Sequence, residues 1–73
     1  MPDLPVVSGE QAAQAFMRGG WVVARRANHI ILTKEGSIVS LSVPSQRELA
    51  PGTLRKLIRL AGLSIEEFAR LVK

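Results

Sequence analysis

Cysteine is absent from this 73-residue chain, and histidine occurs once. Disulfide bonds are therefore excluded, and a zinc site of the usual tetrahedral kind lacks its thiol and imidazole ligands. Aromatic side chains are few, which argues against a surface on which single-stranded bases stack on rings. The longest apolar run is far shorter than the roughly 20 residues that span a bilayer, and the N-terminus has no signal-peptide pattern. We therefore expect no membrane association, no bound metal, no cofactor and a cytoplasmic location.

What the chain does have is an excess of positive charge on a hydrophobic composition. Ten Lys and Arg residues stand against six Asp and Glu residues, which gives a net charge of +4. This charge suits an acidic partner, such as RNA, DNA, an anionic lipid surface or an acidic protein. The hydrophobic fraction of 47% indicates a folded domain and not a basic disordered tail. We predict a single domain over residues 1–73, with residues 1–7 as an extended lead-in.

Helical signals occur on both sides of a central segment. Residues 8–11 read Ser-x-x-Gln and residues 64–67 read Ser-x-x-Glu, and both have the spacing of a capping box that opens a helix. The glycine pair at 19–20 marks the end of the first helix. Apolar residues with the helical period over 54–61 predict a further helix, which begins near Pro51.

The central segment is rich in Val and Ile and predicts three strands, at 21–26, 29–34 and 37–43. A two-residue hairpin turn at Glu35-Gly36 would pair Leu32 with Val39. A short loop before the second strand would place Trp21 opposite Leu32. A longer version of this loop, with Asn28 in the left-handed conformation, is the alternative.

This register sorts the strand residues onto two faces of an antiparallel sheet. The helices are expected to cover the face that carries Trp21, Val23, Ile30, Leu32, Val39, Leu41 and Val43. The uncovered face is expected to hold an apolar strip made of Val22, Ala24, Ile31 and Ile38. Such a strip is either a protein interface or a small and harmless feature. The predicted fold class is α+β, in the order α-β-β-β-α(-α), with the helices on one face of a three-stranded antiparallel sheet.

His29 is the candidate catalytic residue because an imidazole takes and gives protons near neutral pH. The register places it at the start of the second strand, on the uncovered face. An ordinary exposed strand histidine would show the same pattern, so both interpretations stay open. Basic residues that could contact a polyanion such as RNA lie at the two ends of this strand and on the helix after Pro51. They are Arg25, Arg26, Lys34, Arg55 and Lys56.

Several segments taken together resemble the HicA family of small toxins. They are Ser8-Gly9, Gly20-Trp21, Arg25, His29, Val43-Pro44, residues 48–55 and residues 61–68. The most specific part is the Pro-Gly-Thr-Leu-Arg run at 51–55, followed by Ala-Gly-Leu at 61–63. The resemblance implies a fold similar to a double-stranded-RNA-binding domain. It also implies an mRNA interferase, active without metal, that is silenced by a HicB-type antitoxin.

The resemblance extends to the candidate site. The family's catalytic histidine stands at the start of the second strand, and His29 matches it. Ala27-Asn28 stands where many members have glycine-serine, and Gln46 stands where many have another histidine. The Asn28 amide can still hydrogen-bond a phosphate, so we include it among the RNA-contacting residues.

The expected function is therefore that of a toxin that cleaves mRNA with His29 as general acid or base. Its expected partners are mRNA and a HicB-type antitoxin, and the free protein is expected to be a monomer. The differences at residues 27–28 and at Gln46 leave an alternative. In that case the chain is a non-catalytic module of the same fold that binds RNA or another protein.

Overall fold

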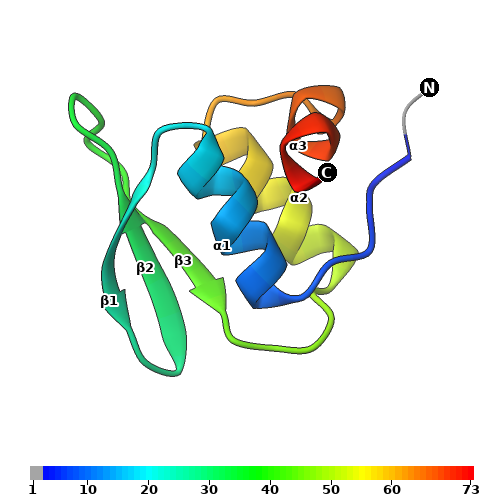
Figure 1. Ribbon diagram of the computed structural model, residues 1–73, viewed down its shortest axis with the longest axis horizontal. Coiled ribbons are helices and arrows are strands. Elements are labelled where there is room, and N and C mark those ends of the chain that lie inside the picture. Colours follow the sequence, from blue (N-terminus) through cyan, green and yellow to red (C-terminus); the bar gives the residue numbers. More distant parts are fainter. Residues whose placement is uncertain (1–2) are drawn as a thin grey trace.

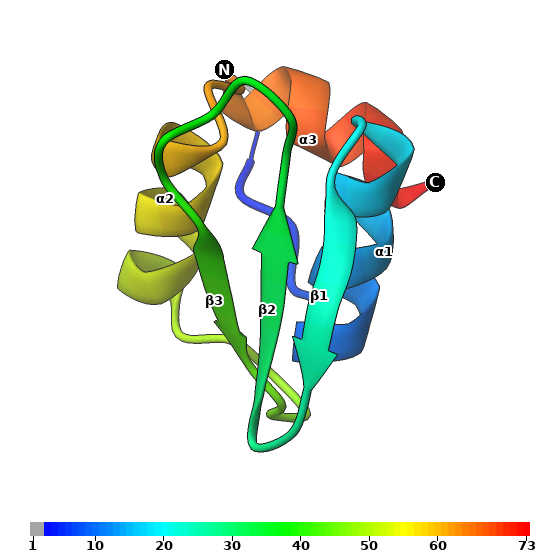
Figure 2. The same cartoon turned by 90° about the vertical axis from the view of Figure 1, so that its left-hand side faces the viewer.

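The computed structural model describes residues 3–73, so the first two residues of the predicted lead-in at 1–7 lie outside the described residues. The elements follow in the order α1 (Gly9–Arg18), β1 (Val22–Arg26), β2 (His29–Thr33), β3 (Leu41–Pro44), α2 (Pro51–Leu60) and α3 (Ile65–Val72). The strands form an open antiparallel sheet in the order β1-β2-β3, and the helices gather on one of its faces (Figures 1 and 2). The predicted α+β fold, similar to a double-stranded-RNA-binding domain, is thus confirmed.

Both predicted capping boxes are present. The Ser8 hydroxyl accepts a hydrogen bond from the backbone N–H of Gln11, whose side chain accepts one from the N–H of Ser8. Ser64 and Glu67 make the same two hydrogen bonds at the start of α3. These bonds satisfy backbone donors that a helix leaves without an internal partner, which fixes where α1 and α3 begin. At the start of α2 no side chain caps the helix, but Pro51 has no N–H, so one fewer backbone donor needs a partner.

The core lies between the helices and the covered face of the sheet. Its largest fully buried side chains are Phe16, Ile30, Leu32, Leu41, Val43, Leu54 and Phe68. The rings of Phe16 in α1 and Phe68 in α3 pack with their centroids 5.1 Å apart. In the part of the chain that the structure describes, no helix is long and apolar enough to span a bilayer. The packing leaves the opposite face of the sheet bare, as predicted.

The register between β2 and β3 differs from the predicted one. Leu32 pairs with Leu41, two residues further along than the predicted Val39. Gly36 has a φ of +86°, and the N–H of Ser37 donates to the carbonyl of Lys34 at 3.0 Å, which is the pattern of a type II turn. Such a turn does not match the twist of a hairpin, so residues 34–40 form a longer loop and β3 is shorter than the predicted 37–43 strand.

Side chains along a strand alternate between the two faces, so a shift of the pairing by two residues leaves the strand residues on their predicted faces. Two apolar residues nevertheless leave the sheet. Val39 was expected in the core, yet its side chain is 36% exposed in the loop. Ile38 is fully exposed in the same loop, so the predicted apolar strip on the uncovered face loses this member. Val22 and Ile31 remain on that face.

The pairing of β1 with β2 also differs from the prediction. Val23, and not Trp21, pairs with Leu32, and a bulge at Ala24 interrupts the ladder. Trp21 lies before β1 but is still buried. The alternative of a longer loop with Asn28 in the left-handed conformation is wrong, because across residues 3–73 only glycines have a positive φ. Ala27 and Asn28 instead form the β1–β2 turn, in which the N–H of Ala27 donates to the carbonyl of His29 at 3.1 Å.

Candidate active site

His29 is the first residue of β2, and its side chain is exposed on the bare face of the sheet. It lines an open hollow of about 210 Å³ together with Arg25, Ala27, Asn28 and Ile31. Within residues 3–73 the imidazole ring makes no hydrogen bond and no ion pair. Both ring nitrogens are therefore accessible to a bound molecule. Ile31, which lies two residues along the same strand, supplies an apolar floor.

The bulge at Ala24 decides which arginine joins this hollow. Without it, the pairing of Val23 with Leu32 would continue so that Arg25 opposed Ile30 on the covered face. With it, Arg25 opposes Ile31 on the bare face, beside His29. Bulges near functional sites commonly re-aim a side chain in this way. The structure thus brings together Arg25, Asn28 and His29 out of the residues that the sequence singled out.

The same bulge sends Arg26 toward the helices. Arg26 opposes Ile30, a covered-face residue, and its guanidinium forms an ion pair with Glu10 of α1. Lys34 lies just beyond the other end of β2. Its ammonium group is 5.9 Å from the centre of the Trp21 ring and donates to the carbonyl of Gly19 at 3.4 Å. Lys34 and His29 lie at opposite ends of β2, so Lys34 is not part of the His29 hollow.

The two basic residues from α2 face different surfaces, although they are neighbours in sequence. Lys56 lines a hollow of about 300 Å³ between α2 and the edge strand β3, together with Ser40, Ser42 and Thr53. Ser42 of β3 pairs with Ile31 of β2, which lines the His29 hollow, so the two hollows lie on neighbouring strands. Arg55 lines a separate groove between α2 and α3. The structure therefore places Lys56 beside the bare face and Arg55 away from it.

Ser45, which the sequence did not single out for this role, holds the His29 turn in place. The Ser45 hydroxyl donates to the carbonyl of Ala27 at 3.3 Å, and the N–H of Ser45 donates to the carbonyl of Asn28 at 3.1 Å. The N–H of Gly9 in turn donates to the carbonyl of Gln46 at 2.8 Å. The start of α1, the segment after β3 and the β1–β2 turn thus form one hydrogen-bonded frame. Such contacts between distant segments leave no periodic signal in the sequence.

In the described part of the chain, no three His, Cys, Asp or Glu side chains are grouped so that they could share a metal ion. The hollow itself brings together one exposed imidazole, a guanidinium, an amide and an apolar floor. A family model described as the HicA toxin of bacterial toxin–antitoxin systems matches residues 9–63. The match covers every element that builds the site, from α1 to α2. A comparison with curated proteins finds no match.

Proposed function

Because this chain belongs to the HicA family of bacterial toxins, we propose that it is an endoribonuclease that cleaves mRNA in the cytoplasm. The observation that carries the proposal is the position of His29, exposed on the bare face of the sheet beside Arg25. General acid–base catalysis needs a group that exchanges protons near the working pH within reach of the substrate. An antitoxin is the partner that family membership implies, and we propose that it is of the HicB type.

The proposed reaction moves two protons and exchanges one bond at phosphorus. The 2′-hydroxyl of the RNA attacks the adjacent phosphorus, and the bond from phosphorus to the 5′-oxygen of the next nucleotide breaks. His29 accepts the 2′-proton or donates a proton to the leaving 5′-oxygen, and water completes the other transfer. The Arg25 guanidinium stabilises the charge that develops on the phosphate oxygens. One imidazole for two proton transfers predicts slow turnover, and the reaction assigns no step to a metal ion.

The path of the RNA follows the row of residues that crosses the sheet. Arg25, Ile31 and Ser42 lie opposite one another on β1, β2 and β3, and Lys56 lines the hollow beyond β3. This row offers a cation at each end, serine hydroxyls between them and His29 at its side. We propose that Arg25, Asn28 and Lys56 contact the RNA backbone, and that Arg26, Lys34 and Arg55 contribute less because they face other surfaces.

The proposal predicts that His29→Ala abolishes RNA cleavage and relieves growth arrest. Removal of a general acid or base lowers catalysis by about 10²–10⁴-fold. The measurement is the initial rate of cleavage of a defined mRNA by the purified protein, together with growth after induced expression. Because the side chain of His29 is exposed and unbonded, the thermal unfolding curve of the variant should match that of the wild type.

The matched control is Gln14→Ala, an exposed polar residue of α1 that lines no part of the hollow and whose side chain makes no hydrogen bond within residues 3–73. It should retain the wild-type rate. Equal cleavage by the His29→Ala and wild-type proteins would remove His29 from the mechanism. RNA binding that falls with salt, without cleavage products from either protein, would instead support the non-catalytic RNA-binding alternative.

A further inference from the structure

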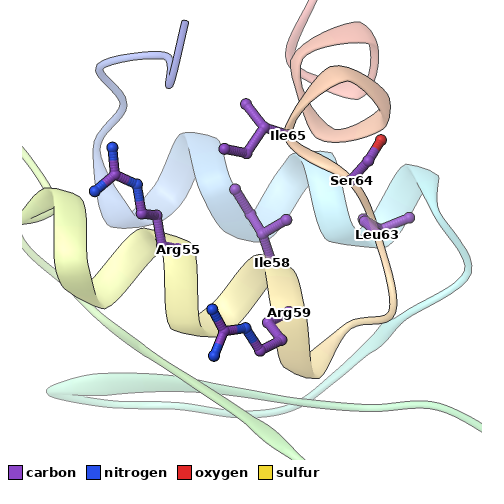
Figure 3. A pocket seen from close by; sticks show the side chains of 6 residues that line it. All are labelled: Arg55, Ile58, Arg59, Leu63, Ser64 and Ile65. Carbon is purple, nitrogen blue, oxygen red and sulfur yellow. The ribbon is translucent and has the colours of Figure 1, made fainter. Parts of the chain in front are cut away.

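The surface behind the sheet contains a groove of about 320 Å³ between α2 and α3. It is lined by Arg55, Ile58, Arg59, Leu63, Ser64 and Ile65, none of which belongs to a strand. Figure 3 shows Ile58 on α2 pointing toward Ile65 at the start of α3, with the side chains of Arg55 and Arg59 beside it on the same helix. The groove therefore combines an aliphatic floor with two guanidinium groups, and it lies on different elements from the His29 hollow.

The guanidinium groups of the groove lack a carboxylate partner within residues 3–73. The side-chain ion pairs formed there are Arg26 with Glu10 and Arg70 with Glu66. The remaining carboxylate in the first turn of α3, that of Glu67, accepts the capping hydrogen bond from Ser64. The charge of Arg55 and Arg59 is thus left for a partner, and a guanidinium pairs most specifically with planar oxyanions such as carboxylates.

The lining favours a protein segment over RNA. The groove presents three aliphatic side chains, those of Ile58, Leu63 and Ile65, and a single hydroxyl, that of Ser64, so most of its surface suits apolar contacts and not phosphates. The aliphatic side chains of the groove can instead pack against aliphatic side chains of a bound peptide. We propose that this groove binds a segment of the antitoxin in which carboxylates flank aliphatic side chains. The interaction does not depend on RNA cleavage, because it leaves the bare face untouched.

The test measures the affinity of the toxin for its antitoxin by calorimetry. His29→Ala serves as the background so that the toxin can be produced safely. In the double variant Arg55→Glu/Arg59→Glu, the groove repels carboxylates, and we expect the dissociation constant to rise at least about tenfold. The control, Arg47→Glu/Lys73→Glu, makes the same change of net charge at exposed residues outside the groove. It should change the dissociation constant less than about threefold.

Further variants and measurements show whether a loss of affinity arises in the groove itself. The neutral pair Arg55→Gln/Arg59→Gln should weaken binding in the same direction and keep the wild-type circular dichroism and unfolding curve, which excludes misfolding as the cause. Equal affinity of the groove and control variants would overturn the proposal. It would also fail if the groove variant weakened binding of a single-stranded RNA oligonucleotide more than binding of the antitoxin. Dissociation of a toxin dimer by the groove variant would likewise overturn it, because a second copy would then occupy the groove.

Discussion

Gly9 has no side chain at the point where α1 meets the backbone at the end of β3. A Cβ placed on Gly9 would overlap the carbonyl oxygen of Pro44 and lie 3.0 Å from its carbonyl carbon. Pro44 pairs with His29 in the sheet, so this close approach is part of the frame of the candidate site. Backbone atoms cannot rotate away as the end of a flexible side chain can. The contact therefore tolerates glycine and resists any larger residue.

We predict that Gly9→Ala lowers the free energy of unfolding by about 1–3 kcal/mol, because overpacking forces the backbone to shift. Chemical denaturation measures the change. The matched control is Gly52→Ala, which lies in the first turn of α2 with no atom within 4 Å of its Cβ. That substitution should raise stability by about 0.4–1 kcal/mol by restricting the unfolded chain. Equal effects of the two substitutions would show that the contact with Pro44 does not constrain Gly9.

For single residues, the sequence predicts the sheet face on which a side chain lies better than it predicts the contacts that the side chain makes. His29 is found exposed on the bare face as expected, because strand alternation depends on neighbours in sequence. That Arg25, and not Arg26, lies on the bare face could not be predicted, because it depends on a bulge at Ala24 that no pattern of residue types marks. The hydrogen bonds of Ser45 to the β1–β2 turn join segments that are far apart in the chain, and they exist only once the sheet has formed.

Among the secondary-structure elements, the helices matched their predicted bounds most closely. Capping boxes and terminal glycines act within a few residues, so their signal survives in the sequence alone. The strands were found, but their register was not, because residues 34–40 set the pairing of β2 with β3, and the β1–β2 turn and the bulge at Ala24 set that of β1 with β2. The turn at Glu35-Gly36 has a positive φ at Gly36 and not at Glu35, which makes it a type II turn. Because a type II turn does not suit a two-residue hairpin, the loop is longer and the pairing of β3 shifts by two residues.

The two capping boxes differ in one respect that can be measured. Hydrogen bonds from the backbone and then the side chain of Ser64, with a smaller contribution from Arg70, hold the pKa of Glu67 below its ordinary value of 4.5. A carboxylate whose pKa is lowered by folding stabilises the protein above its unfolded pKa. That stabilisation is lost as the pH falls through the folded pKa. Gln11 holds the same position in α1 and does not titrate.

We therefore predict that Glu67→Gln makes α3 less sensitive to acid. Glutamine keeps the hydrogen-bond acceptor for Ser64 but carries no charge to lose. The free energy of unfolding of the wild type should fall more steeply than that of the variant as the pH is lowered from about 6 to below 4. Denaturation curves across this range measure both slopes. Parallel slopes would show that Glu67 does not contribute to the acid sensitivity of the fold, and Gln11→Glu should introduce such a contribution at α1.

At the scale of the whole molecule, the proposed function depends on packing on one side of the sheet. All three helices lie on one side of the sheet, where α1 and α2 contact its strands and α3 packs on α1 and α2, and the other face is left to solvent (Figure 2). Of the basic residues that the sequence selected, Arg25 and Lys56 flank the bare face, whereas Arg26 and Lys34 are bound to other parts of the chain. The net charge of +4 predicted an acidic partner but not its location. The location follows from how each cation is aimed once the elements have packed.

This division predicts how RNA binding responds to salt. Each phosphate that a cation neutralises on a single strand changes the slope of log K against log salt by about −0.7. In the His29→Ala background, Arg25→Gln and Lys56→Gln should each reduce the magnitude of the slope by about 0.7. Arg55→Gln is the matched control, because it removes the same charge one residue away but from the groove between α2 and α3. Its slope should equal that of the background protein. If Arg55→Gln and Lys56→Gln changed the slope equally, RNA would not be confined to the bare face.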